Sequence, residues 1–295
     1  MRKFQLISDS SCDTPRELLE KYQIHTIPFY VSFDETIYEK EIEEISLEKF
    51  YSRLTTEKVF PKTSLPSVQD YIDTFTPYLK QGLDILCLNL SKKFSGSYQS
   101  ARTAKDILLE DFPNANIYIL DSYQATAGQG LTLMQAAKMM EAGLTLEETV
   151  IQLEQLRLTS RIMFTVGTLE YLQKGGRVGK AASLAGTILN LKPMIVLENG
   201  ELFPKGTVRG RKKSLERVIS MTREYFESIG EKFDHYDFCL ATGTCVEETQ
   251  QLQRMLEELI ERKIEYPLFP IGVTIGTHTG PDALGVVFIK KWDVE

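Results

Sequence analysis

Short apolar runs alternate with longer helical patterns in the first half of the chain. The apolar runs, each bounded by turn residues, are 4–8, 83–90 and 116–120. Apolar residues recur at helical spacing in the segments 67–82, 97–112 and 130–143. Strands that alternate with helices in this way predict a parallel sheet with helices packed on its faces.

The second half of the chain has a different pattern. Residues 193–206 predict a β-hairpin, because Asn199-Gly200 is a strong turn pair with apolar residues on both sides. Further strands are predicted at 162–166, 237–242, 271–275 and 284–289, and two long amphipathic helices near 212–229 and 245–262. This order of elements predicts an α+β domain with a mainly antiparallel sheet.

The chain is long enough, at 295 residues, for two domains. A helix that starts at the capping box of Thr145 and Glu148 leads towards the strand at 162–166 without a flexible linker. We place the boundary in this passage and predict an N-terminal α/β domain, residues 1–157, and a C-terminal α/β domain, residues 158–295. The predicted fold class is therefore α/β, with a mainly parallel first sheet and a mainly antiparallel second one.

Composition narrows the class of protein. Hydrophobic residues make up 42% of the chain and charged residues 25%, as in average soluble globular proteins. No apolar run reaches the roughly 20 residues of a membrane span, and the first apolar stretch is too short for a signal peptide. The formal net charge of −7 argues against a general nucleic-acid surface. We therefore expect a cytoplasmic protein with no membrane span and no nucleic-acid partner.

Several signatures of catalysis and cofactor binding are absent from the sequence. The four cysteines form no CxxC pair, which argues against a zinc site. There is no P-loop motif, no GxGxxG between a strand and a helix, no HExxH and no GxSxG. We therefore expect no metal, no cofactor and no catalytic residue, a set of absences that fits a binding protein better than a self-sufficient enzyme.

Polar residues follow several of the predicted strands, most densely in SKKFSGSYQSA after the run at 83–90. In an open α/β sheet, ligands bind beyond the carboxyl ends of the strands. Gly96 lets the backbone turn, and Ser95 or Ser97 can cap the following helix, whose N-terminus attracts an anion. Two interpretations remain open at this point: an anion site, or serines that only cap the helix.

A histidine and an arginine are further candidates. His278 follows the predicted strand at 271–275, so we expect it in a loop, where it can donate to an oxyanion or carry a proton. A loop histidine without a function is the alternative. Arg177 follows Gly175-Gly176 and can bind a carboxylate or phosphate in a bidentate manner.

Two other segments have both a structural and a functional interpretation. Residues 183–190, SLAGTILN, predict an apolar helix that either lines a narrow cavity or packs closely in the core. The basic patch Arg209, Arg211, Lys212 and Lys213 is either a solvated helix start or a surface for an anionic partner. Cations are unfavourable at a helix N-terminus, which mildly favours a functional role for this patch.

Seven motifs together resemble the DegV family. In chain order they are SDSSCDTP, PKTSLPS, SKKFSGSYQSA, DSYQATAGQG, GGRVGKAASLAGTILNLKP, GTVRGRKKS and IGTHTGPDALGVVF. They occur in the family's order and extend over nearly the whole chain. Members of this family bind a long-chain fatty acid between two α/β domains, so the resemblance implies a ligand such as palmitate, stearate or oleate.

In bacteria the family includes the fatty-acid-binding subunit of fatty acid kinase. That subunit presents the acyl carboxylate to a separate ATP-binding kinase subunit, which converts it to acyl phosphate for phospholipid metabolism. The resemblance therefore implies a substrate-binding subunit rather than an enzyme by itself. The alternative is a small-molecule phosphotransfer or hydrolytic enzyme that uses His278 or Ser95, although no third residue that would orient a base can be named.

The resemblance also assigns roles to individual residues. The fatty-acid carboxylate is expected at Thr63, Ser95, Gly96, His278 and Thr279. The residues expected near the head group, or at the surface that docks the kinase, are Arg177, Arg209 and Arg211. The acyl tunnel is expected to include Leu184 and Ile188. The chain departs from the commoner family pattern at Cys12, Lys93-Phe94 and Ser97, and these departures bear on chain-length preference.

Overall fold

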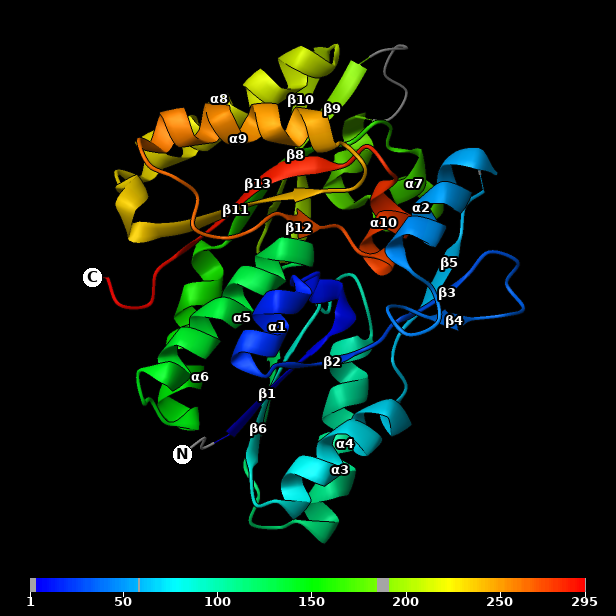
Figure 1. Ribbon diagram of the computed structural model, residues 1–295, viewed down its shortest axis with the longest axis vertical. Coiled ribbons are helices and arrows are strands. Elements are labelled where there is room, and N and C mark those ends of the chain that lie inside the picture. Colours follow the sequence, from blue (N-terminus) through cyan, green and yellow to red (C-terminus); the bar gives the residue numbers. More distant parts are fainter. Residues whose placement is uncertain (1–3, 58, 185–190, 295) are drawn as a thin grey trace.

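The computed structural model describes residues 4–57, 59–184 and 191–294. In Figure 1 the elements of the first 160 residues lie mostly in the lower part, and the later elements lie in the upper part. Each part contains one of the two larger sheets, with helices packed around it (Figure 1). This arrangement confirms the predicted α/β fold class.

The lower sheet is four-stranded and parallel. Its strands in spatial order are β2 (His25–Ile27), β1 (Phe4–Asp9), β6 (Asp84–Asn89) and β7 (Ile117–Asp121). Every residue of β1 is buried, because helices cover both faces of the sheet, and this explains the continuous apolar run in that strand. One face carries α3 (Val68–Lys80) and α4 (Ser97–Asp111), and the other carries α1 (Arg16–Tyr22), α5 (Thr126–Glu141) and α6 (Leu146–Leu156). The predicted parallel sheet is confirmed.

The upper sheet has six strands. In spatial order they are β10 (Glu201–Arg209), β9 (Leu191–Glu198), β8 (Arg161–Thr165), β13 (Leu284–Lys290), β11 (Tyr236–Thr242) and β12 (Phe269–Pro270). All neighbouring pairs are antiparallel except β11 and β12. The helices α8 (Arg211–Ile229) and α9 (Val246–Ile260) cover one face, and the other face packs on the core that contains α5. The mainly antiparallel sheet, the hairpin at Asn199-Gly200 and both long helices are confirmed.

A third sheet is not predicted by the sequence pattern. It consists of β4 (Glu39–Lys40), β3 (Tyr30–Ser32) and β5 (Lys62–Ser64), all antiparallel. Strands of two or three residues are too short for a period of two to be visible. Helix α2 (Leu47–Thr56) shares a small core with this sheet, and Figure 1 shows both beside the helix α10 (Val273–Thr279).

The prediction of a strand at 271–275 is wrong. Val273–Thr279 forms the helix α10, and His278 lies in its last turn rather than in a loop. The consecutive β-branched residues Val273, Thr274 and Ile275 favour a strand locally. However, Gly272, Gly276 and Gly280 recur every four residues, so in a helix they share one face. Contacts made by that face decide the conformation.

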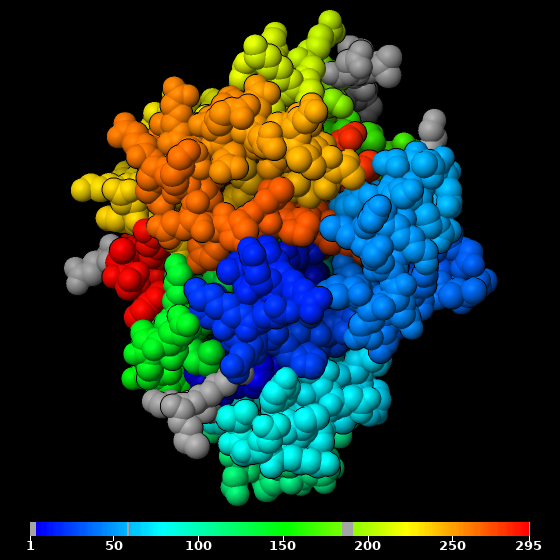
Figure 2. Space-filling view, in the orientation of Figure 1, coloured from blue at the N-terminus to red at the C-terminus, as the bar shows by residue number. Residues whose placement is uncertain are grey.

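The glycine face of α10 contacts its neighbours without an intervening side chain. A Cβ at Gly276 would lie 2.7 Å from the Tyr51 hydroxyl oxygen, and a Cβ at Gly280 would lie 2.5 Å from Cδ2 of Tyr171. Figure 2 shows the residues around α2, in light blue, packed directly against the orange segment that leads to α10. As a result α10 lies close to α2 and to α7 (Glu170–Lys174), and its other face is directed between the two larger sheets.

Two carboxyl groups are buried against the start of α10. Glu41 accepts hydrogen bonds from Ser10 Oγ at 2.6 Å, and from the Thr274 hydroxyl at 2.8 Å and amide at 3.1 Å. Burial raises the pKa of Glu41, and these hydrogen bonds partly offset that effect. Burial, followed by the negative charge of Glu41, raises the pKa of Asp13 well above its ordinary value. Asp13 therefore keeps its proton at pH values where an exposed aspartate is ionised.

A third buried carboxylate, Asp9, holds the ends of the parallel strands. Its two oxygens accept hydrogen bonds at 2.6–3.2 Å from Ser11 Oγ, Asn89 Nδ2, Leu90 N, Ser97 Oγ and Gln129 Nε2. A buried charge is tolerated when it receives this many donors. Asp9 thereby fixes the loop from β6 to α4, which contains Ser95.

We predict that Ser97→Ala lowers the free energy of unfolding by about 1–3 kcal/mol, because Asp9 and the Tyr71 hydroxyl both lose a buried hydrogen-bond partner. Urea denaturation measures this change. The control is Ser100→Ala on the same helix, where the side chain is only half-buried and we expect a change within about 0.5 kcal/mol. Equal losses in the two variants would contradict the role of Ser97.

We predict that stability falls less steeply with rising pH in Asp13→Asn than in the parent protein. In the unfolded chain Asp13 ionises near pH 4, as an ordinary exposed aspartate does, whereas its raised pKa in the folded chain retains the proton. The contribution of Asp13 to the free energy of unfolding is therefore complete below about pH 4. It is lost as the pH rises towards the raised pKa of the folded chain, by at most about 1.4 kcal/mol per pH unit. Urea denaturation between about pH 5 and pH 8 tests this, with the exposed Asp106→Asn as control. Parallel curves for parent and Asp13→Asn would refute it.

Candidate functional site

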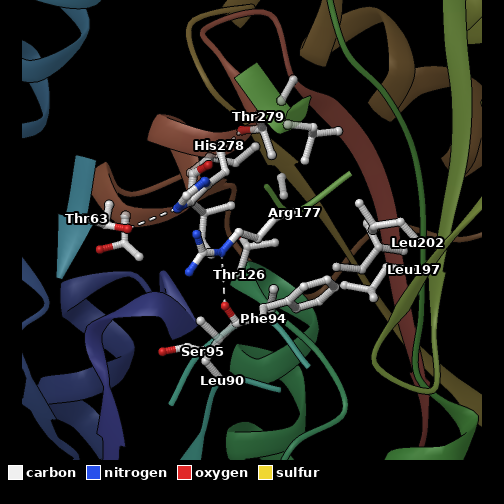
Figure 3. Close-up of a pocket in the computed structure, with 18 of the residues that line it drawn as sticks. Thr63, Leu90, Phe94, Ser95, Thr126, Arg177, Leu197, Leu202, His278 and Thr279 are labelled. Carbon is white, nitrogen blue, oxygen red and sulfur yellow. Dashed lines mark hydrogen bonds between the residues drawn. The ribbon is translucent and has the colours of Figure 1, made fainter. Parts of the chain in front are cut away.

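A cavity of about 220 Å³ lies between the two larger sheets (Figure 3). The first half of the chain contributes residues from β5, from the loop after β6 and from the start of α5. The second half contributes residues from α10 and from the inner face of the upper sheet. Most of the wall is apolar and includes Leu90, Phe94, Phe164, Leu197, Leu202 and Ile275.

The polar groups of the cavity are gathered on one side. Figure 3 shows Thr63, Ser95 and His278 on that side and Leu197 and Leu202 on the other. Thr63 Oγ1 and His278 Nε2 form a hydrogen bond of 3.0 Å that joins β5 to α10. The cavity is therefore divided into a polar end and an apolar remainder.

His278 is neutral in this environment. Burial, followed by the positive charges of Arg177 and Lys62, lowers its pKa to about 4. Its Nδ1 atom is buried and has no hydrogen-bond partner among the described residues, whereas Nε2 contacts Thr63. At neutral pH this imidazole can orient a neighbouring hydroxyl, but it carries no charge that would neutralise an anion.

Ser95 both faces the cavity and takes part in the start of α4. Its Oγ atom accepts a hydrogen bond from the Ser97 amide at 3.1 Å, which leaves the hydroxyl proton available to a ligand. Ser97 does not cap the helix, because its buried hydroxyl donates to Asp9. Ser95 therefore combines the two predicted roles of this segment. Its oxygen supports the start of α4, and its hydroxyl faces the cavity where an anion can bind. Gly96 is the N-cap residue and is not among the residues that line the cavity.

Arg177 forms part of the cavity wall although its side chain is exposed. Its Nε donates to the Phe94 carbonyl at 3.2 Å, and its Nη1 donates to the Gly175 carbonyl at 2.6 Å. The side chain thus connects the segment after α7 with the loop that contains Ser95 (Figure 3). Together with Lys62, it gives the polar end a positive surrounding that attracts an anion.

Other residues predicted for the site lie elsewhere in the described structure. Arg209 is exposed at the end of β10, and Arg211 begins α8, where its Nη2 donates to Cys245 Sγ at 2.9 Å. Neither arginine lines the cavity. Leu184 is half-buried against the main core but is not among the lining residues. Ile188 lies outside the described residues.

Sequence reasoning missed most of the apolar lining. Ile162, Phe164 and Leu197 belong to strands that the pattern predicts correctly. The period of two separates the two faces of a strand, but it does not show which face meets a cavity. Thr274 was missed as well, because the pattern around it predicts a strand instead of α10.

The described residues contain no group of three or more histidine, cysteine, aspartate or glutamate side chains placed to hold a metal ion. Among the helices of the described ranges, none has the length and apolar character needed to cross a membrane. The polar end of the cavity consists of hydroxyls and one neutral imidazole, with cations nearby. Such a set can bind a single anionic group by hydrogen bonds.

Comparison with known proteins identifies relatives over the full length of the chain. A DegV domain-containing protein of Clostridium perfringens is 33% identical over 294 residues, which cover 98% of each chain. A protein of Thermotoga maritima named "Fatty acid-binding protein" is 34% identical, with 96% of each chain covered. The crystal structure of a stearic acid-binding protein from Eubacterium ventriosum is 36% identical and superposes with a TM-score of 0.94, over 98% of this chain and 99% of that one.

The family model agrees with these relatives. The family described as "Uncharacterised protein, DegV family" matches residues 3–291. The motifs that resemble this family in the sequence include PKTS and FSGS, and the structure brings Thr63 and Ser95 from these two motifs to one cavity. The family model and the alignments with these relatives each extend over nearly the whole chain, so this protein belongs to the DegV family.

Proposed function

We propose that this protein binds a long-chain fatty acid, such as palmitate, stearate or oleate, in the cavity between its two larger sheets. The observation that carries the proposal is the division of the cavity into a polar end and an apolar remainder. A molecule with one anionic end and a long apolar chain matches this division. The relatives named as fatty acid-binding and stearic acid-binding proteins support the same class of ligand.

In this proposal the carboxylate binds at the hydroxyls of Thr63 and Ser95, beside His278. A buried carboxylate needs hydrogen-bond donors, since an unpaired buried charge costs several kcal/mol. Gly96 itself does not line the cavity, but it directly follows Ser95, and we propose that its backbone amide is a further donor at the edge of the polar end. The Thr279 hydroxyl already donates to the Ile275 carbonyl at 3.1 Å. Thr279 is therefore part of the cavity wall and has no hydroxyl proton left to donate to the carboxylate.

The acyl chain is proposed to extend from the polar end towards Leu197 and Leu202 (Figure 3). Each methylene removed from water contributes about 0.8 kcal/mol. A chain of about sixteen carbons therefore supplies ample gross affinity, part of which is offset by the entropy lost on binding. The carboxylate then determines the orientation of the ligand more than its affinity.

We also propose that a separate ATP-binding kinase subunit acts on the bound fatty acid. A carboxylate oxygen attacks the γ-phosphorus of ATP, the bond to ADP breaks, and acyl phosphate is formed for phospholipid metabolism. Hydrogen bonds from neutral hydroxyls leave the carboxylate more nucleophilic than a bidentate arginine would. We propose that Arg177, which forms part of the cavity wall, stabilises the transferred phosphoryl group. The exposed Arg209 is a candidate contact for the kinase.

The geometry does not favour an enzyme that forms a covalent intermediate on Ser95 or His278. The hydrogen bond of His278 Nε2 is to Thr63 and not to Ser95. The Ser95 oxygen accepts a backbone amide, so no base is seen to activate it among the described residues. The binding function is therefore the one that the site supports best.

We predict that denaturing extraction of the purified protein followed by mass spectrometry recovers a fatty acid of about 14 to 18 carbons.

We predict that Thr63→Val combined with Ser95→Ala weakens palmitate binding at least about tenfold, because hydrogen bonds to a charged group are lost. Binding of hexadecanol, which has the same chain without the carboxylate, should change much less. Ser100→Ala is the matched control. Absence of both recovered lipid and palmitate binding would exclude the proposed ligand.

We predict that Arg209→Glu prevents acyl phosphate formation with the ATP-binding subunit of a fatty acid kinase, while palmitate binding is retained. The change reverses the charge at an exposed position outside the cavity. Product formation with labelled ATP and a separate palmitate titration measure the two effects. Arg254→Glu, exposed on α9, is the control. Full activity of Arg209→Glu would show that this arginine does not dock the kinase.

A further inference from the structure

Gly175 lies in close contact with the imidazole ring of His278. It ends α7 with φ −76° and ψ −11°, an ordinary right-handed conformation that any residue can adopt. The backbone therefore does not require glycine here. A Cβ at this position, however, would overlap His278 Nδ1 and would lie 2.9 Å from Cε1 of the same ring. The absence of a side chain is what allows the ring to occupy its place.

This contact distinguishes the two nitrogens of His278. Nδ1 is buried, has no hydrogen-bond partner among the described residues, and faces the hydrogen of Gly175 that a Cβ would replace. A proton on Nδ1 would meet that hydrogen and would have no acceptor, which is an unfavourable state for a buried N–H group. Nε2, in contrast, lies 3.0 Å from Thr63 Oγ1. A neutral imidazole carries one N–H, and the surroundings favour its position on Nε2.

The position of this proton decides what Thr63 can offer to a ligand. When Nε2–H donates to Thr63 Oγ1, the Thr63 hydroxyl proton remains free to point into the cavity. With the proton on Nδ1, Nε2 would instead accept the Thr63 proton, and only oxygen lone pairs would face the carboxylate. A carboxylate accepts hydrogen bonds and is repelled by lone pairs, so only the first arrangement binds it.

We propose that Gly175 is a positioning residue that holds His278 as its Nε2–H tautomer, so that Thr63 donates its hydroxyl proton to the carboxylate of the bound ligand. This inference rests on the proposed fatty-acid function. It adds a direction to the hydrogen-bond chain, from His278 through Thr63 to the ligand, and it gives Gly175 of the GGR motif a role that its backbone conformation does not explain.

Nitrogen NMR of the imidazole rings tests the tautomer directly. The chain has only three histidines, so His278→Gln assigns the signal of interest by its loss. In ¹⁵N-labelled protein at neutral pH, we expect His278 with a protonated Nε2 and an unprotonated Nδ1, both with and without palmitate. A protonated Nδ1 in the palmitate-bound protein would overturn the inference, whether or not fatty acid is the natural ligand.

Gly175→Ala tests the positioning role. The added methyl group displaces the ring, so palmitate binding should weaken about tenfold or more, the equivalent of one hydrogen bond to a charged group. Hexadecanol binding should be unchanged, because it does not depend on a donor to a carboxylate. Gln173→Ala, an exposed change on the same helix, is the control. Equal weakening of both ligands would indicate a structural role only and would overturn the proposal.

A double-mutant cycle completes the test. In the His278→Ala background the ring is absent, so Gly175→Ala should cause no further loss of palmitate affinity. Additive losses would show that Gly175 acts through another contact. If the parent protein binds palmitate and hexadecanol equally and yields no lipid, the proposed function fails. The NMR result then still reports which tautomer His278 adopts beside Gly175, and the same spectrum of Gly175→Ala reports whether the tautomer depends on this glycine.

Discussion

The close approach of α10 to its neighbours is the constraint on which the site depends. Gly276 and Gly280 leave no side chain between this helix and the aromatic rings of Tyr51 and Tyr171. The helix can therefore lie close against α2 and α7 and direct His278 into the space between the two larger sheets. A bulkier residue on the glycine face would move the helix, and the 3.0 Å contact between His278 and Thr63 would be lost with it.

The polar end of the cavity combines short-range contacts from segments far apart in the chain. Thr63 comes from a three-residue strand, Ser95 from the loop held by Asp9, and His278 from α10. Thr63 and His278 hydrogen-bond each other, and the loop of Ser95 is held by Asp9 and by the Ser97 amide, so these contacts form without a ligand. The apolar end needs no such support, because hydrophobic contacts have no preferred direction and require only the inner faces of strands such as β8 and β9.

The sequence predicted elements well where the pattern is long and local. The alternation of strands and helices predicts the parallel sheet, Asn199-Gly200 predicts the hairpin, and the capping box at Thr145 and Glu148 is present in the structure. The same reasoning fails for β3, β4 and β5, which are too short to show a period. It also fails for α10, because the valine, threonine and isoleucine of that segment favour a strand when neighbours are ignored.

By itself, the sequence determined the chemical types at the site and the family to which they belong, because motifs such as PKTS and FSGS are local in the chain. The tertiary structure alone decided that Thr63 and His278 share a hydrogen bond, that Ser97 binds Asp9 instead of capping α4, and that Gly175 lies against an imidazole. These contacts join residues tens to hundreds of positions apart. Local patterns contain no information about such distances, whereas close packing in the folded interior fixes them within a few tenths of an ångström.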